Sequence, residues 1–328
     1  MSELEDAVAT VIRLLSKNMQ VVKNDGSIAQ IHVSPEWCDR ELFKNIDGQI
    51  TVGLAESRDQ KIEMSGRLRR RLGTLRVNVW AADKAASSDS GMAMRKKMVE
   101  EVNRIVRQSC NKPNEIVYDF PSVGQPTGTH KAFSAASASE LAPGHGSWIE
   151  LVDVDYEKVW YSDDIRYSKS ADVDGEYALT LFRFKIDCKE ATVRKIILIF
   201  EGFGVAQETT YGVTVKVWNH VTKVWENGQT GTGTTDETLT ITLNSNLTDY
   251  IDDDGYVWLI ARTTNPSDGT NSATLFCDHV NCAVTVNGIT YLDVTSFRDA
   301  DLVNVKPYIF HTEFALKSWC FEDIGGVF

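Results

Sequence analysis

The stretch Val213-Thr-Val-Lys-Val217 alternates apolar and polar side chains, which is the pattern of a half-buried β-strand. The same two-residue period recurs in three other segments: Phe182–Ile186, Leu239–Leu243 and Val257–Ala261. The turns between them are rich in Asp, Asn and Gly, and no helical stripe of apolar residues interrupts residues 148–286. Short strands with turn signals at this spacing predict an antiparallel β-sandwich.

Helical spacing marks the first part of the chain. Apolar residues recur every three or four positions within residues 3–19 and again before Ser109, which predicts two amphipathic helices. The second helix follows a small, polar stretch in which Asp89 or Ser90 can cap it. Strands are predicted at residues 28–33, 49–55, 66–82 and 115–120.

The sequence pattern at the end of the chain is similar to that of its first part. Two long strands are predicted there, at residues 289–297 and 304–321. So short a segment cannot bury a core alone. The fold class that we predict is therefore α+β, a small mixed sheet with two helices formed by residues 1–130 and 287–328. It is interrupted by an all-β sandwich at residues 131–286, because insertion at a surface loop is well tolerated when its ends lie close together.

A segment rich in Pro, Gly, Ser and Ala separates the first part of the chain from the strand-rich middle segment. Residues 121–146 contain three Pro and four Gly and show little apolar periodicity. We interpret them as the linker into the sandwich.

The formal charge of −12 is unevenly distributed. Residues 1–130 carry 19 Lys+Arg and 17 Asp+Glu, residues 131–286 carry 12 and 23, and residues 287–328 carry 3 and 6. A uniformly acidic surface would repel nucleic acid, but the two outer segments together are close to neutral. We therefore expect the acidic middle segment to face solvent, and only the outer segments to lie next to DNA.

Three further observations exclude other classes of protein. The longest apolar run, Ile196–Phe200, is too short to span a membrane, and no membrane contact is predicted. The acidic first residues lack the basic start of a secretory signal. Six scattered cysteines without a dense framework indicate reduced thiols.

Four segments of the outer parts carry a resemblance to a known family. They are Gly73–Ala81, Met94–Val106, Ser296–Asp301 and Pro307–Phe314. A basic strand with an aromatic near its end leads to a helix, and a Phe- and Tyr-rich strand follows near the end of the chain. This arrangement resembles the tail-terminator and tail-completion proteins of long-tailed phages and archaeal tailed viruses. The long insertion departs from the compact pattern of that family.

The resemblance implies a structural virion protein without enzymatic activity. It implies a homo-oligomeric ring, usually a hexamer, at the head-proximal end of the tail. Such a ring terminates the tail tube and joins it to the neck, so its partners are tail-tube and neck or head-completion proteins. The implied location is the tail or neck of the virion, after assembly in the host cytoplasm.

The middle segment resembles a second group of proteins. Val215–Asn219, Lys223–Glu226 and Leu247–Trp258 are similar to the jelly-roll modules of carbohydrate-binding and surface proteins. Because a fold does not establish a function, two interpretations stay open. The sandwich is an outward decoration of the virion, or the chain is a viral or cell-surface protein that binds glycans through it. Three tryptophans either stack on sugar rings or pack inside the sandwich: Trp218, Trp225 and Trp258.

The densest positive cluster consists of Arg67, Arg69, Arg70 and Arg71. In a ring, such a cluster from each subunit would line a channel and contact the phosphates of passing DNA without reading its sequence. The alternative is a solvated strand or a face of salt bridges between subunits.

Two turns are rich in carboxylates, Asp172-Val-Asp174 and Asp252-Asp-Asp254. Calcium takes several oxygen ligands at this kind of spacing, so a structural calcium ion is the one cofactor that we consider. The alternative is that these turns are solvated. The six histidines show no neighbouring Ser or Cys partner, and we predict no catalytic residues.

Overall fold

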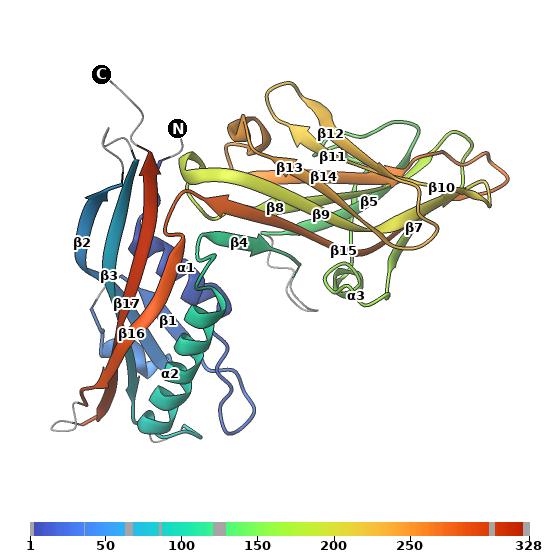
Figure 1. Cartoon of the computed structure of the whole chain (residues 1–328). Helices are drawn as coiled ribbons and strands as arrows, with labels where there is room; N and C mark the ends of the chain where they lie inside the picture. Colours follow the sequence, from blue (N-terminus) through green and yellow to red (C-terminus); the bar gives the residue numbers. More distant parts are fainter. Residues whose placement is uncertain are drawn as a thin grey trace. The chain divides into compact units, whose positions relative to one another are not determined.

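A computed structural model describes residues 3–35, 37–62, 68–84, 87–120, 129–301 and 306–323. Over these residues the protein is mostly β, with three α-helices (Figure 1). The chain divides into two compact units. We call Leu4–Asn114 with Asn287–Phe328 the mixed-sheet unit, and Met1–Glu3 with Glu115–Val286 the sandwich unit. None of the helices in the described ranges has the length and apolar character needed to cross a membrane.

The mixed-sheet unit is a five-stranded sheet in the order β1-β2-β3-β17-β16. Its strands are β1 (Ile31–Ser34), β2 (Gly48–Lys61), β3 (Leu68–Ala82), β16 (Tyr291–Asp299) and β17 (Ile309–Asp323). β1 and β2 are parallel, and the other neighbours are antiparallel. Because β17 lies between β3 and β16, the returning end of the chain completes the sheet.

Two helices cover one face of this sheet, α1 (Ala7–Asn18) and α2 (Gly91–Gln108), and a 3₁₀ turn spans Glu41–Lys44 (Figure 1). Of the two candidate caps of α2, Ser90 is the one used, since its side chain accepts a hydrogen bond from the Ala93 amide. Asp89 instead accepts a hydrogen bond from the Asn24 amide and pairs with Lys97 at 2.8 Å. The core between helices and sheet includes Val11, Leu15, Leu75, Val77, Met98, Val102, Phe314 and Leu316.

The sandwich unit contains two sheets, each six-stranded within the described ranges. The first sheet has the central order β10 (Thr210–Tyr211), β9 (Val193–Ala206), β15 (Ala273–Val286) and β4 (Glu115–Tyr118). Two further strands belong to it: β13 (Glu237–Leu243) pairs with β9, and β7 (Tyr167–Ala171) pairs with β15. The second has the order β12 (Val224–Gly231), β11 (Val213–Asn219), β14 (Tyr256–Thr263), β8 (Tyr177–Lys185), β5 (Lys131–Ser137) and β6 (Ile149–Glu150). Short helical turns are α3 (Asp153–Glu157), Glu190–Thr192 and Leu247–Tyr250.

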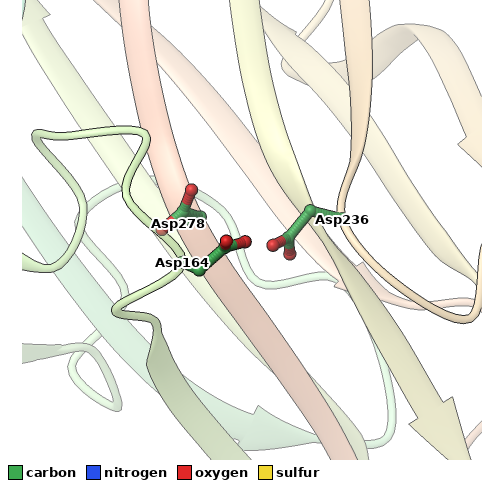
Figure 2. Close-up of side chains that lie close together, drawn as sticks. All are labelled: Asp164, Asp236 and Asp278. Atoms are coloured by element: carbon green, nitrogen blue, oxygen red, sulfur yellow. The ribbon is translucent and has the colours of Figure 1, made fainter.

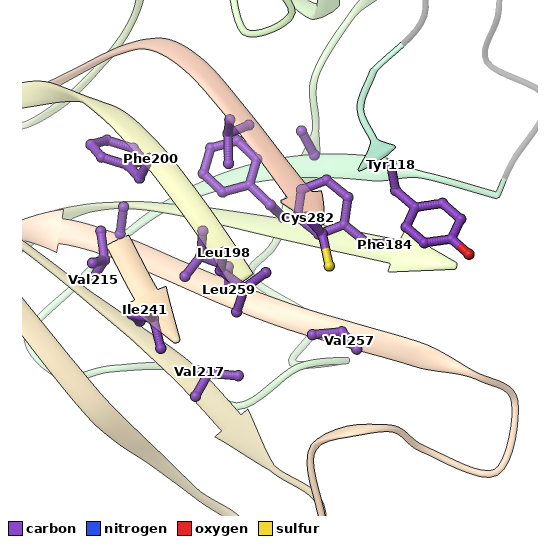
Figure 3. Packing of buried hydrophobic residues seen from close by; sticks show 14 of the residues in the cluster. Tyr118, Phe184, Leu198, Phe200, Val215, Val217, Ile241, Val257, Leu259 and Cys282 are labelled. Atoms are coloured by element: carbon purple, nitrogen blue, oxygen red, sulfur yellow. The ribbon is translucent and has the colours of Figure 1, made fainter. Parts of the chain in front are cut away.

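The predicted two-residue alternation places one side of each strand in the sandwich core. Figure 3 shows Leu198 and Phe200 of one sheet packed with Val215, Val257 and Leu259 of the other. Each is at most 1% exposed, so their burial contributes to the hydrophobic stabilisation of this unit.

The chain enters the sandwich earlier than the sequence suggests. We expected the boundary near residue 130, but β4 pairs with β15, and Phe120 is fully buried in the sandwich core. Residues 131–137, expected to be linker, form β5 and pair with β8. Their small residues gave little apolar signal, although Ala132 is fully buried. Residues 121–128 lie outside the described part of the chain.

Candidate ligand-binding face and charged clusters

Strand β14 presents two aromatic side chains on the outer side of its sheet. Val257 and Leu259 point into the core between the sheets, so Tyr256 and Trp258 point the other way, and both stay partly exposed. Their ring centroids are 6.2 Å apart, with planes inclined by 57°. The alternating sequence pattern places Trp258 on the face opposite Val257 and Leu259, but it left open whether Trp258 packs inside the sandwich, and it did not single out Tyr256.

Two basic side chains from the neighbouring strand β8 contact these rings. Arg183 is the cross-strand partner of Trp258, and its guanidinium carbon lies 4.4 Å from the Tyr256 ring centroid and 5.6 Å from that of Trp258. The ammonium nitrogen of Lys185 lies 4.8 Å from the Tyr256 centroid. Cation–π attraction of this kind holds the charged groups beside the rings. We call Arg183, Lys185, Tyr256 and Trp258 the aromatic face.

The other two tryptophans also lie outside the core between the sheets. Trp218 and Trp225 are cross-strand partners on β11 and β12, in edge contact with centroids 5.0 Å apart. The indole of Trp225 donates a hydrogen bond to the Leu141 carbonyl at 3.0 Å, and Trp218 is 8% exposed. On β11 the alternate residues Val215 and Val217 point into the core between the sheets, so Trp218 lies on the outer side of its sheet, where it is buried and packs against Trp225.

The segment that contains Glu140 covers another part of the same sheet. The Glu140 carboxylate accepts hydrogen bonds from Lys216 at 2.7 Å and Arg262 at 2.8 Å. Burial favours the protonated acid, but these two bonds outweigh it and hold the pKa of Glu140 below its usual value. The ionised carboxylate therefore fixes this segment over β11 and β14.

The predicted arginine cluster lies on β3, opposite polar residues of β2. Arg70 donates to the Gln60 amide oxygen at 2.7 Å, and Arg71 pairs with Asp59 at 2.9 Å. Arg69, which is also partly buried, pairs in register with Lys61, while Arg67 lies outside the described residues. The Arg71–Asp59 ion pair lies within one chain, and the role of the cluster in a DNA channel or at a subunit interface stays a prediction.

Among the residues that the structure describes, neither acidic turn gathers three ligand side chains. Asp172 accepts a hydrogen bond from Ser272, and Asp174 is exposed. Asp252 accepts from the backbone amides of Asp254 and Tyr256 at 3.1 and 2.7 Å, which closes its turn.

Within the described ranges, one group of three or more His, Cys, Asp or Glu side chains could hold a metal ion. It consists of Asp164, Asp236 and Asp278, outside both acidic turns (Figure 2). It escapes sequence reasoning because the three residues stand in separate segments of the chain without a shared spacing.

The comparisons with known proteins concern part of the chain. A family model described as "Uncharacterized protein, C-terminal domain" matches residues 136–286, and no curated protein matches the chain. Similar solved structures include a CBM4 structure (14% identity, 36% of this chain and 94% of that chain, TM-score 0.23). A carbohydrate-binding module of CBM28, specific for non-crystalline cellulose, is 12% identical over 50% of this chain and 92% of its own, with a TM-score of 0.26. The CBM22-1 xylan-binding domain from Paenibacillus barcinonensis is 8% identical over 52% and 94%, with a TM-score of 0.22. The sandwich thus has a distant structural similarity to carbohydrate-binding modules.

Proposed function

We propose that the protein binds glycans through the aromatic face of its sandwich. The observation that carries this proposal is the contact of Arg183 with both Tyr256 and Trp258 on the outer side of β14. Aromatic rings offer flat apolar area to the C–H faces of a sugar, and a guanidinium donates hydrogen bonds to its hydroxyl or acidic groups. Both kinds of contact stand together on one rigid strand pair.

The charge of this face favours acidic sugars. Arg183 and Lys185 lie beside the rings, although the surrounding segment is strongly acidic overall. Guanidinium pairs well with carboxylates and sulfates, because its donors match their geometry. We therefore expect glycans that carry carboxylate or sulfate groups to bind more tightly than neutral ones, and their binding to weaken as salt rises.

A glycan array with the full chain tests the proposal, followed by calorimetric titration of the best oligosaccharide. Trp258→Ala should weaken binding about tenfold or more, which corresponds to about 1.4 kcal/mol. Tyr161→Ala is the matched control, because Tyr161 is a 51% exposed aromatic of the same unit that does not belong to the aromatic face. Absence of binding to any acidic or neutral glycan at millimolar concentration would overturn the proposal, and so would equal affinity of the Trp258→Ala variant.

A second function, the virion ring at the head-proximal end of the tail, is favoured by a surface of the mixed-sheet unit. An apolar groove of about 420 Å³ lies between α2 and the edge strand β16. Met92 and Phe297 line it and are 52% and 61% exposed, while Phe314 forms part of its wall. An edge strand presents unpaired backbone groups to another chain, so we propose a second copy as the occupant.

Native mass spectrometry of the full chain tests this second proposal. A closed oligomer, with a hexamer as the expected size, should dissociate on Phe297→Glu, because that change places a charge in the contact. Phe321→Glu changes another exposed phenylalanine of the same sheet and is the control. A monomer at all concentrations would exclude the ring, and with it the neck and tail-tube partners.

A further inference from the structure

Three aspartates converge in the sandwich unit from separate segments. Asp164 follows α3, Asp236 immediately precedes β13, and Asp278 lies in β15. One carboxylate oxygen of each lies within 4.8 Å of the others. Figure 2 shows the three side chains close together. Like charges at this separation repel one another strongly unless a cation lies between or beside them.

Asp278 owes its position to a β-bulge. The pairing of β15 with β9 shifts register between Cys277 and His279, so Asp278 is the extra residue of the bulge. It is only 1% exposed, and its Oδ1 atom has no hydrogen-bond partner. A buried carboxylate oxygen without a partner is costly, which indicates that a ligand completes its surroundings.

One basic side chain neutralises part of this charge. Arg166 donates to both oxygens of Asp236 at 2.9 and 2.7 Å and to Asp164 at 2.9 Å. These bonds leave Oδ1 of Asp278 without a partner. Three carboxylates beside one guanidinium leave an excess of negative charge that a divalent ion would offset.

We propose that Asp164, Asp236 and Asp278 bind a divalent cation of the calcium class. All three donors are carboxylate oxygens, which hard cations prefer, whereas zinc prefers nitrogen and sulfur ligands. Calcium accepts irregular sets of six to eight oxygens, which suits donors from three unrelated segments, while magnesium demands a regular octahedron. Water and backbone carbonyl oxygens would supply the remaining ligands.

Thermal unfolding of the full chain in 5 mM calcium chloride and in 5 mM EDTA tests the site. Calcium should raise the melting temperature of the sandwich transition by about 5 °C, since ligand binding to the folded state alone stabilises it. Equal melting temperatures in calcium and EDTA would overturn the proposal.

Two variants test whether the three aspartates bind a cation or only support the local structure. Asp278→Asn should abolish the response to calcium, yet in EDTA it should melt no lower than the original chain, because it removes charge repulsion. Should this buried change prevent folding, Asp164→Asn gives a second test, since Asp164 is exposed and Asn tolerates its φ of 66°.

Asp172→Asn is the matched control in an exposed acidic turn, and it should keep the full calcium response. Loss of the response in this control, but not in the two site variants, would overturn the assignment.

Discussion

Glu115 of β4 and Thr285 of β15 are paired residues of adjacent antiparallel strands. The chain therefore enters and leaves the sandwich at neighbouring positions, as an inserted module requires. In the mixed-sheet unit, the Cys110 carbonyl accepts a hydrogen bond from the Leu292 amide at 2.9 Å, so the two ends of that unit are also held together.

Removal of the sandwich should leave a folded mixed-sheet unit. A chain that joins Asn114 to Asn287 through a short Gly/Ser linker keeps both β3 and β17, which pair over fifteen residues. We expect it to be soluble and to unfold cooperatively, as measured by circular dichroism during heating. An insoluble product, with residues 4–114 alone folding stably, would contradict the split unit.

Two cross-strand partners in the mixed-sheet unit should respond very differently to truncation. Phe314 is fully buried and Phe297 is 61% exposed, although their rings are 5.6 Å apart. Phe314→Ala should lower the free energy of unfolding by about 3–5 kcal/mol, because it leaves a cavity in the core. Phe297→Ala should cost about 1 kcal/mol or less. Urea denaturation of the two variants measures both values, and similar losses would disprove this placement of the core.

Acidification should weaken the mixed-sheet unit through His311. The imidazole ring stacks on Trp80 with ring centroids 3.7 Å apart, and its Nε2 atom forms a hydrogen bond with Oδ1 of Asn78 at 3.0 Å. Burial lowers the pKa of His311 below the ordinary value of 6.5. The unfolded chain therefore binds a proton more readily than the folded one, so this stability is complete above about pH 6.5 and is lost as the pH falls toward the folded pKa.

Urea unfolding at pH 7.5 and pH 5.5 checks the role of His311. The original chain should lose stability between these values, and His311→Gln should lose less, because Gln cannot be protonated there. An equal pH dependence in both chains would assign the effect to other groups, such as His220, whose pKa burial also lowers.

A methyl group at Gly91 should not be tolerated, although alanine favours helices. A Cβ atom at this first residue of α2 would lie 2.8 Å from backbone atoms of Ala82 and Asp83 and 2.7 Å from Phe310. We expect Gly91→Ala to reduce the free energy of unfolding by about 1–3 kcal/mol. Gly53→Ala is the control, since nothing lies within 4 Å of its added Cβ. Equal urea midpoints for the two variants would contradict this close approach.

The predictable parts of the fold were those that a periodic pattern encodes. Val215 and Leu259 belong to alternating runs, so their strands and inward faces followed from the sequence, whereas the sequence left open whether Trp258 packs inside the sandwich. Strand β5 did not follow, because alanine and serine give little hydrophobic contrast between its two faces.

The carboxylate cluster could not be predicted, because its geometry depends on long-range pairing. Asp278 lies near Asp164 and Asp236 because it is the extra residue of the β-bulge where β15 pairs with β9. No local sequence signal marks that bulge. The acidic turns at Asp172 and Asp252 attracted attention instead because their carboxylates are adjacent in the sequence.

The position of β17 between β3 and β16 also sets the order in which the protein can fold during synthesis. When the ribosome has made β3, the partner strand of its long edge is still more than two hundred residues away. The whole sandwich leaves the ribosome before β17 is made. The sandwich can therefore fold while one edge of β3 still lacks its partner strand. We expect the nascent chain to depend on chaperones during this interval, and the finished protein to be released from them only when β17 has been translated.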